Sequence, residues 1–169
     1  CTGHGVPGAL MSMIGNRLLN EIVNEKNISD PAAILEQLHL SLKTTLQADT
    51  GNMISREAMD LALCCIDRDK KLLRYAGAVC PLFLAKNGSL QIIKGNIYSV
   101  GENTYLPAIS HELKFTNHNI PIANDMCVYM SSDGFIDQFG GNNKQKFGTT
   151  RFKKLLFEIA GLEISKQEK

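Results

Sequence analysis

The chain of 169 residues contains no tryptophan, few aromatic residues (7%) and no marked excess of either charge. Its 18 basic and 17 acidic residues give a net charge of +1, which argues against a nucleic-acid-binding protein. No apolar run approaches the roughly 20 residues that span a bilayer, so we expect no membrane insertion of this segment. This leaves open whether the parent protein is membrane-anchored. A hydrophobic fraction of 44% is ordinary for a globular protein.

The cysteines form no C-x-x-C pair. Cys64 and Cys65 are adjacent, whereas Cys1, Cys80 and Cys127 stand alone. The odd count and the lack of a secretory leader predict reduced thiols in a cytoplasmic segment. We expect the internal cysteines to fill apolar core positions, as free cysteine often does.

The sequence contains no repeat, low-complexity tract or long Pro/Gly-rich linker, so residues 1–169 are interpreted as a single domain. Helical spacing of apolar residues predicts a helix from Ala9 to about Lys26, with Pro7 suited to its first turn. A second helix is expected to begin at Pro31, capped by Ser29 or Asp30, and to reach about Leu46.

The apolar pattern becomes strand-like after Asn52. Short apolar runs separated by turn residues predict two β-hairpins, a weaker strand, a further strand and a final helix. These elements are Met59–Ile66 with Leu72–Ala76, Pro81–Lys86 with Leu90–Ile93, His111–Thr116, Met126–Met130 and Arg151–Ala160. Short turns require antiparallel pairing, so the fold class is α+β with an antiparallel sheet. The nearly continuous apolar strands predict sheets covered on both faces.

A glycine-rich loop, C-T-G-H-G-V-P-G, opens the chain. Gly3 and Gly5 let the backbone approach a ligand, and the following helix would point its N-terminal amides at an anion such as phosphate. The alternative is a plain turn into a helix. His4 is a candidate metal ligand or proton donor, or an exposed polar residue.

Three acidic residues are candidate metal ligands. Asp133 follows the apolar strand Met126–Met130 and precedes Gly134, at the rim of the expected sheet; Asp137 lies four residues later. Carboxylate oxygens suit Mg²⁺ and Mn²⁺. The alternative makes Asp133 a helix N-cap and Asp137 a solvated side chain. Asp60 interrupts an apolar strand, so it lies either in solvent at the strand's start or beside a cation.

Four blocks occur in an order that resembles one family. They are C-T-G-H-G-V-P-G-A-L-M-S, then M-D-L-A-L-C-C-I-D, then L-R-Y-A-G-A with P-L-F, then S-S-D-G-F-I-D-Q-F-G-G with K-F-G. Together they resemble the stage II sporulation protein E-like branch of the metal-dependent (type 2C) serine/threonine protein phosphatases.

The resemblance implies a β-sandwich of antiparallel sheets flanked by helices, with two Mn²⁺ or Mg²⁺ ions activating a water that attacks phosphoserine or phosphothreonine. It assigns Asp133 as a catalytic metal ligand and the main-chain carbonyl of Cys1 as another. Asp60 takes a supporting or metal role. The expected substrate is a phosphorylated protein of the anti-sigma-factor-antagonist type, and an upstream sensory or regulatory domain is the expected partner.

The family pattern also includes an aspartate directly before Cys1 and an Asp-Asp motif beyond Lys169. We therefore expect the 169 residues alone to be truncated at both ends and to bind two metals weakly or not at all. Two other functions also fit parts of this pattern. One is a catalytically inactive phosphatase-like interaction module. The other is a nucleotide-binding domain, which is disfavoured because the loop lacks the Lys-Ser/Thr ending of a P-loop.

Overall fold

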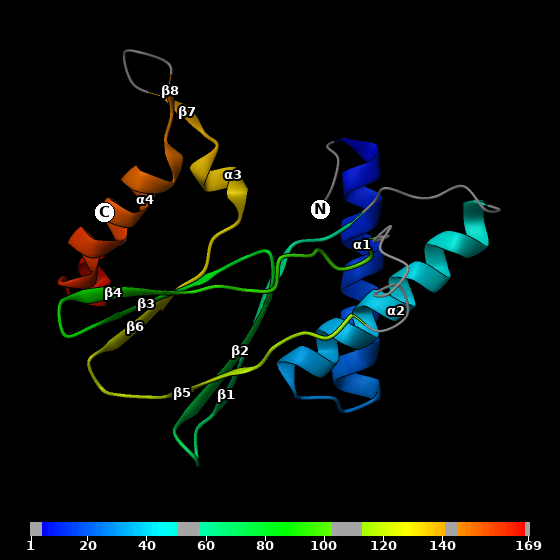
Figure 1. Cartoon of the computed structure of the whole chain (residues 1–169), viewed down its shortest axis with the longest axis horizontal. Helices are drawn as coiled ribbons and strands as arrows, with labels where there is room; N and C mark the ends of the chain where they lie inside the picture. The colour runs from blue at the N-terminus through cyan, green and yellow to red at the C-terminus, as the bar shows by residue number, and fades with distance from the viewer. Residues whose placement is uncertain (1–4, 51–57, 103–112, 141–144, 168–169) are drawn as a thin grey trace. The chain divides into compact units, whose positions relative to one another are not determined.

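The computed structural model describes residues 5–50, 58–102, 113–140 and 145–167, without the side chains of 47–50 and 164 (Figure 1). The chain divides into two compact units. The first unit comprises Cys1–Val79 and Gly95–Pro121, and the second comprises Cys80–Lys94 and Ile122–Lys169. The interpretation of residues 1–169 as one domain stays a prediction.

The two predicted helices of the first unit are present. Helix α1 spans Val6–Asn20 with proline in its first turn and continues as a π-helical turn, η1, over Glu21–Glu25. Asn27 then takes a positive φ of 55°, a conformation that asparagine tolerates better than most residues and that ends the helix. Helix α2 spans Pro31–Thr50.

The cap of α2 is Asp30 rather than Ser29. Its carboxylate accepts a hydrogen bond from the Ala33 backbone N–H (3.0 Å) and two from the Asn117 side-chain amide (2.8 and 2.7 Å). Arg74 completes the cluster with a 3.5 Å contact to the same carboxylate. Burial raises the pKa of Asp30, but these hydrogen bonds and the Arg74 charge bring it below its usual value. Asp30 therefore ties α2 to strand β2 and to the segment at Asn117.

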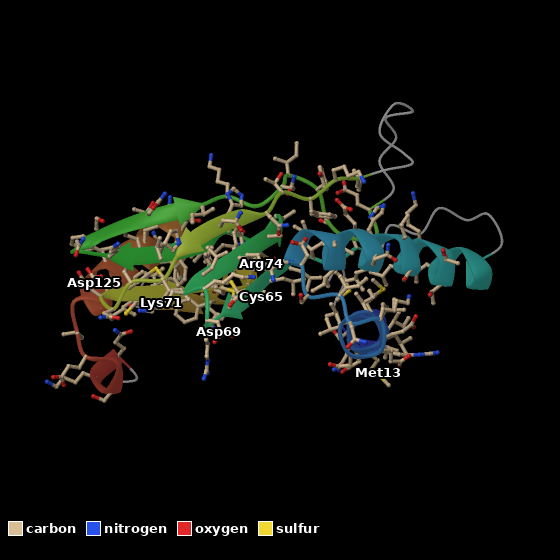
Figure 2. The ribbon with its side chains drawn as sticks, turned by 90° about the horizontal axis from the view of Figure 1, so that it is seen from below. Met13, Cys65, Asp69, Lys71, Arg74 and Asp125 are labelled. Carbon is tan, nitrogen blue, oxygen red and sulfur yellow. The ribbon has the colours of Figure 1, made fainter. Side chains whose placement is uncertain are left out.

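The first unit holds a three-stranded antiparallel sheet in the order β1-β2-β5. Strand β1 (Leu61–Asp67) and strand β2 (Leu72–Ala78) form the predicted hairpin, in register from Leu61–Ala78 to Asp67–Leu72. Figure 2 shows the turn residues Asp69 and Lys71, and Arg74 beside Cys65, whose sulfur accepts its hydrogen bond at 3.5 Å. The third strand, β5, is His118–Pro121, pairing with β2 from Leu72–Pro121 to Tyr75–His118.

The predicted strand His111–Thr116 is wrong in its described part, because residues 113–116 are not a strand; residues 111 and 112 lie outside the described residues. In this segment the Phe115 N–H donates to Glu36 and the Thr116 N–H to Asn96, so side chains satisfy backbone groups that a ladder would otherwise bind. A short apolar run predicted a weaker strand, whereas these side-chain acceptors hold the backbone of residues 113–116 in a loop.

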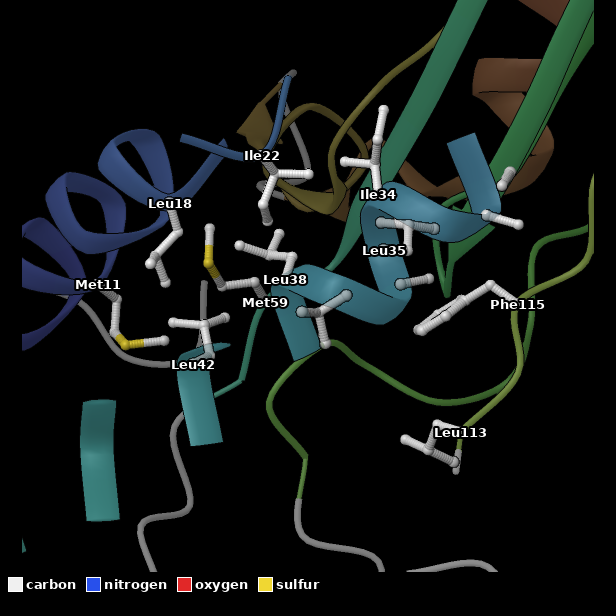
Figure 3. Close-up of a cluster of buried hydrophobic side chains, with 14 residues drawn as sticks. Met11, Leu18, Ile22, Ile34, Leu35, Leu38, Leu42, Met59, Leu113 and Phe115 are labelled. Atoms are coloured by element: carbon white, nitrogen blue, oxygen red, sulfur yellow. The ribbon is translucent and has the colours of Figure 1, made fainter. Parts of the chain in front are cut away.

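The core of the first unit lies between the helices and the sheet (Figure 3). Met11, Leu18 and Ile22 of α1 and η1 face Leu35 and Leu38 of α2. Met59, which precedes β1 and bridges Val100, fills the space beside α1. A β-carbon at Gly15 would lie 2.5 Å from the Met59 terminal methyl, so glycine is what permits this close packing.

The second unit holds a second antiparallel sheet, in the order β4-β3-β6. Its strands are β3 (Leu82–Lys86), β4 (Ser89–Ile93) and β6 (Met126–Tyr129), with an Asn87-Gly88 turn between β3 and β4. Both turn residues have positive φ, 51° for Asn87 and 67° for Gly88, as a tight hairpin requires. The hairpin and strand predictions in this unit are confirmed.

After β6 the described part of the second unit continues with three short elements and two helices. These are α3 (Asp133–Ile136), β7 (Phe139–Gly140), β8 (Gln145–Lys146), α4 (Gly148–Ala160) and α5 (Ile164–Gln167). Phe152 and Leu156 of α4 are buried against Phe83 of β3. The predicted final helix is confirmed, beginning three residues earlier, at Gly148 rather than Arg151. None of the helices in the described ranges is long and apolar enough to cross a membrane.

The α+β class with antiparallel sheets is confirmed. Both central strands, β2 and β3, are buried at nearly every position, as the continuous apolar runs predicted. The edge strands β1, β4 and β6 are mostly half-buried. Antiparallel hairpins joined by short turns thus account for most of the sheet structure in both units.

Candidate active site

Asp133 begins helix α3 four residues after the end of strand β6 at Tyr129. Ser132 is the N-cap, in extended conformation (φ −79°, ψ 169°), and the Asp137 N–H donates to the Asp133 carbonyl at 2.8 Å to close the turn. The Asp133 side chain is exposed, and its carboxylate has no hydrogen-bond or ion-pair partner in the described part of the chain. The predicted position at the end of an apolar strand is confirmed, and the N-cap alternative is wrong because Ser132 holds that place.

Gly134 and Asp137 have different roles from Asp133. A β-carbon on Gly134 would meet the Ser132 hydroxyl at an ordinary 3.5 Å, and its φ is not positive, so no steric reason demands glycine there. Asp137 lies one turn after Asp133, but its carboxylate forms an ion pair with Lys146 at 3.1 Å. Asp137 is therefore already engaged across the β7–β8 ribbon, whereas Asp133 presents its oxygens to solvent.

Asp60 belongs to the first unit and directly precedes β1, between the buried Met59 and the half-buried Leu61. Its side chain is exposed and accepts a hydrogen bond from the Ser99 hydroxyl at 2.5 Å. The surroundings of Asp60 match the first of the two alternatives, a carboxylate in solvent at the start of a strand. Its role toward a cation stays a prediction.

The glycine-rich loop is described from Gly5 onward. Gly5 has φ 69° and ψ −143°, a region that is essentially accessible only to glycine, and its carbonyl accepts the Ala9 N–H at 3.1 Å. Gly5 thus makes the turn that starts α1. The remaining loop candidates, Cys1, Gly3 and His4, lie outside the described residues.

A pocket of about 400 Å³ in the second unit was not predicted from the sequence. Three phenylalanines line it, together with Gln138, Gln145 and Arg151; the phenylalanines are Phe135, Phe139 and Phe147. The Phe147 N–H donates to the Gln138 carbonyl at 2.8 Å, which joins the two sides of the pocket. The available signal was the recurrence of phenylalanine at positions 135, 139 and 147 in an otherwise polar and glycine-rich stretch.

No three His, Cys, Asp or Glu side chains among the described residues lie close enough together to hold a metal ion. Asp133 is in the second unit and Asp60 in the first. The described residues therefore supply single carboxylates, and the expected two-metal ligand set stays a prediction.

Comparison with known proteins connects these features. A family model described as stage II sporulation protein E (SpoIIE) matches residues 1–167. Among solved structures, the SiaA-PP2C domain of Pseudomonas aeruginosa is similar, with 32% identity and a TM-score of 0.81 over 99% of this chain and 61% of that chain. The present chain thus spans about three fifths of that solved chain. No curated protein matches the chain.

Proposed function

The chain belongs to the stage II sporulation protein E family, generally serine/threonine phosphatases of the PP2C type, and on that premise we propose that it hydrolyses phosphoserine or phosphothreonine on a bacterial regulatory protein. The placement of Asp133 carries the proposal. Its exposed carboxylate stands where an apolar strand meets a turn, in the S-D-G motif on which the family resemblance rests. The substrate is proposed to be a phosphorylated protein of the anti-sigma-factor-antagonist type.

The chemistry of the donor set fits the proposed cofactor, Mn²⁺ or Mg²⁺. Hard cations take carboxylate oxygens and keep several waters, so one exposed aspartate from each of several segments suits them. Asp133 is the first candidate and Asp60, with one oxygen already accepting from Ser99, is the second. Further ligands, such as the Cys1 carbonyl, would lie outside the described residues.

In the proposed mechanism the cofactor supplies the chemistry, and the residues of the protein hold the cofactor in place. When bound, two such ions lower the pKa of the attacking water and neutralise charge on the phosphoryl oxygens. Asp133 holds its carboxylate in the first turn of α3, fixed by the backbone hydrogen bond to Asp137. No cysteine nucleophile is needed, which agrees with cysteines that are half-buried at positions 64, 65, 80 and 127.

Regulation is proposed to reach the first unit through α1 and α2, from an upstream sensory or regulatory domain. Gly15 of α1 lies against Met59, and Met59 precedes the candidate ligand Asp60. A displacement of α1 would therefore shift Met59 and, with it, the start of β1. Hydrogen exchange of the full-length protein, with and without its signal, should change protection in α1; unchanged protection would count against this coupling.

Catalysis is tested on the full-length protein after removal of metal with a chelator. We expect p-nitrophenyl phosphate and a phosphoserine peptide to be hydrolysed only when Mn²⁺ or Mg²⁺ is restored, with a phosphotyrosine peptide a poorer substrate. Metal-dependent turnover supports the enzyme. Absence of turnover at every metal concentration, with tight binding of a phosphoprotein, would instead indicate the inactive interaction module.

A further inference from the structure

The pocket of the second unit begins two residues after Asp133. Phe135, in the same short helix α3, forms part of its wall, so the pocket is joined to the candidate ligand through a single turn of backbone. Its volume of about 400 Å³ falls in the range of pockets that hold small ligands or individual side chains. All of the residues that line the pocket belong to the second unit.

The aromatic wall is anchored to the core of this unit. The Phe135 ring meets Phe147 edge to face at 5.4 Å between centroids, and also lies 5.4 Å from Phe152. Phe152 is buried and packs edge to face on Phe83 of β3 at 5.2 Å. This chain of rings holds the wall in place before any ligand arrives, which lowers the entropic cost of binding.

The outer side of the pocket is exposed and apolar. Phe139 is 70% exposed and Phe135 44% exposed. Phe139 is held from one side by the β7–β8 pairing with Lys146, whose ammonium lies 5.9 Å from its ring centre. Lys146 in turn pairs with Asp137. An exposed phenylalanine kept in place in this way offers a ready surface for an apolar side chain.

Arg151 supplies the charge at the pocket. Its guanidinium donates to the neutral side-chain oxygen of Gln145 at 3.3 Å, and within the described ranges it has no carboxylate partner. The neighbouring cation Lys146 is already paired with Asp137, and Lys154 of α4 lies 3.8 Å from Glu158. Arg151 is thus the lining residue with an uncompensated positive charge, and its planar fork suits phosphate or carboxylate oxygens.

We infer that this pocket is a substrate-recognition subsite that takes a large apolar side chain flanking the phosphorylated residue, with Arg151 binding an anionic group of the same polypeptide segment. The occupant is the phosphoprotein substrate, so the inference rests on the proposed function. Charge complementarity supports it: the substrate segment is anionic, and the lining arginine is unneutralised beside an aromatic wall. The anionic group is either the phosphate or a flanking carboxylate.

The test uses the full-length protein with Mn²⁺ and pairs of phosphoserine peptides. In one series each flanking position in turn carries phenylalanine or alanine, and in the other glutamate or glutamine. We expect one position at which phenylalanine raises kcat/KM about tenfold over alanine, the usual scale for a well-packed aromatic anchor. The same pairs, with a non-hydrolysable phosphonate in place of phosphate, are measured for binding by fluorescence anisotropy.

Two variants and two matched controls assign the preference to the pocket. Phe139→Ala should remove the preference for phenylalanine, whereas Phe157→Ala, which removes an exposed ring of α4 outside the pocket, should retain it. Arg151→Gln should weaken substrate binding, whereas Lys153→Gln, an exposed cation on the same helix, should not. If Arg151→Gln weakens only peptides with glutamate, the guanidinium binds a flanking carboxylate; equal weakening of all phosphopeptides assigns it to the phosphate.

The inference is overturned if no flanking position shows a preference for phenylalanine, or if Phe139→Ala and Phe157→Ala retain it equally. An Arg151→Gln effect no larger than that of Lys153→Gln would overturn the charged part. Failure of the proposed function has a different signature, namely no metal-dependent hydrolysis of p-nitrophenyl phosphate by the unmodified protein. In that event the anisotropy series still decides whether the pocket selects an apolar side chain.

Discussion

The two units of this chain use their apolar residues in different ways. In the first, Leu35, Leu38 and Leu42 of α2 are fully buried against α1, η1 and Met59. In the second, buried Phe83 and Phe152 form a small cluster, while Phe135 and Phe139 in the wall of the pocket remain exposed. Buried leucines thus form the framework of the first unit, which also exposes Val6, Met13 and Ile97, whereas the second unit gathers exposed aromatic rings at a pocket.

Mutations should therefore have different consequences in the two units. Truncation in a well-packed core loses transfer free energy and leaves a cavity, so it lowers the free energy of unfolding. Truncation of an exposed side chain changes the free energy of unfolding little and has an effect only on the binding of a partner. Substitutions in the buried core of the first unit should act on folding, and those around Asp133 and the pocket on function.

The largest effect is expected from Leu38→Ala in the first unit. Leu38 is fully buried, so the loss should be about 2–5 kcal/mol in the free energy of unfolding. Leu40→Ala is the matched control, because Leu40 lies on the same helix and is 48% exposed; its loss should stay below about 0.5 kcal/mol. Urea denaturation of both variants measures the difference, and equal losses would contradict the assigned core.

Acid should destabilise the first unit through His39. This buried imidazole accepts the Gly101 N–H at Nδ1 (3.1 Å). Burial, helped by the Lys43 charge, lowers its pKa from 6.5 to about 4. Between these values the unfolded chain binds a proton that the folded chain does not. Stability should therefore fall as pH drops from 6.5 to 4, by about 3 kcal/mol in all, with no further loss from His39 below that range.

The His39 contribution is isolated by comparing the native protein with His39→Gln. Other groups titrate in both proteins and cancel. Unfolding by urea at about pH 7 and about pH 5 should show the variant losing roughly 2 kcal/mol less on acidification. The same pH dependence in both proteins would show that His39 is not held neutral by the fold.

A smaller effect separates the two residues that could cap α2. Asp30→Ala removes the hydrogen bonds from Ala33 and Asn117 and the contact with Arg74, and should cost about 1–2 kcal/mol. Ser29→Ala, one residue earlier and exposed, should cost almost nothing. Thermal unfolding measures the loss of stability in both variants. A larger loss from Ser29→Ala than from Asp30→Ala would show that Ser29, and not Asp30, caps α2.

The smallest effect is expected at Asp137 in the second unit. Its ion pair with Lys146 is exposed on both sides, 53% for the lysine and 55% for the aspartate, so Asp137→Asn should change stability by less than about 0.5 kcal/mol. Urea denaturation of both proteins in low and high salt measures this change in the free energy of unfolding. A loss well above 1 kcal/mol would mean that the pair organises the β7–β8 ribbon.

Local signals in the sequence predicted most elements because those elements depend on neighbours along the chain. Pro7 marks a helix start through its fixed backbone angle and Asp30 through its capping side chain, and turn residues between apolar runs mark the hairpins. Strand β5 was missed because His118–Pro121 is polar, contains proline and is a strand only through its pairing with β2, far away in sequence.

The same distinction applies to the candidate site. The position of Asp133 at the end of β6 followed from the apolar run before it, and its exposure agrees with a ligand role. The pocket could not be predicted, because it depends on how Phe135, Phe147 and Arg151 come together after folding. The engagement of Asp137 by Lys146 likewise arises from the pairing of β7 with β8.

The most direct measurement is kcat/KM of the full-length protein on a phosphoserine protein with Mn²⁺, comparing Asp133→Asn with Asp125→Asn. Both aspartates are exposed and belong to the second unit, and Asp125 lies in the turn before β6. We predict that Asp133→Asn lowers kcat/KM at least about a hundredfold with an unchanged free energy of unfolding, as loss of a metal ligand should. Asp125→Asn should behave as the unmodified protein. Equal activity of the two variants would contradict the account.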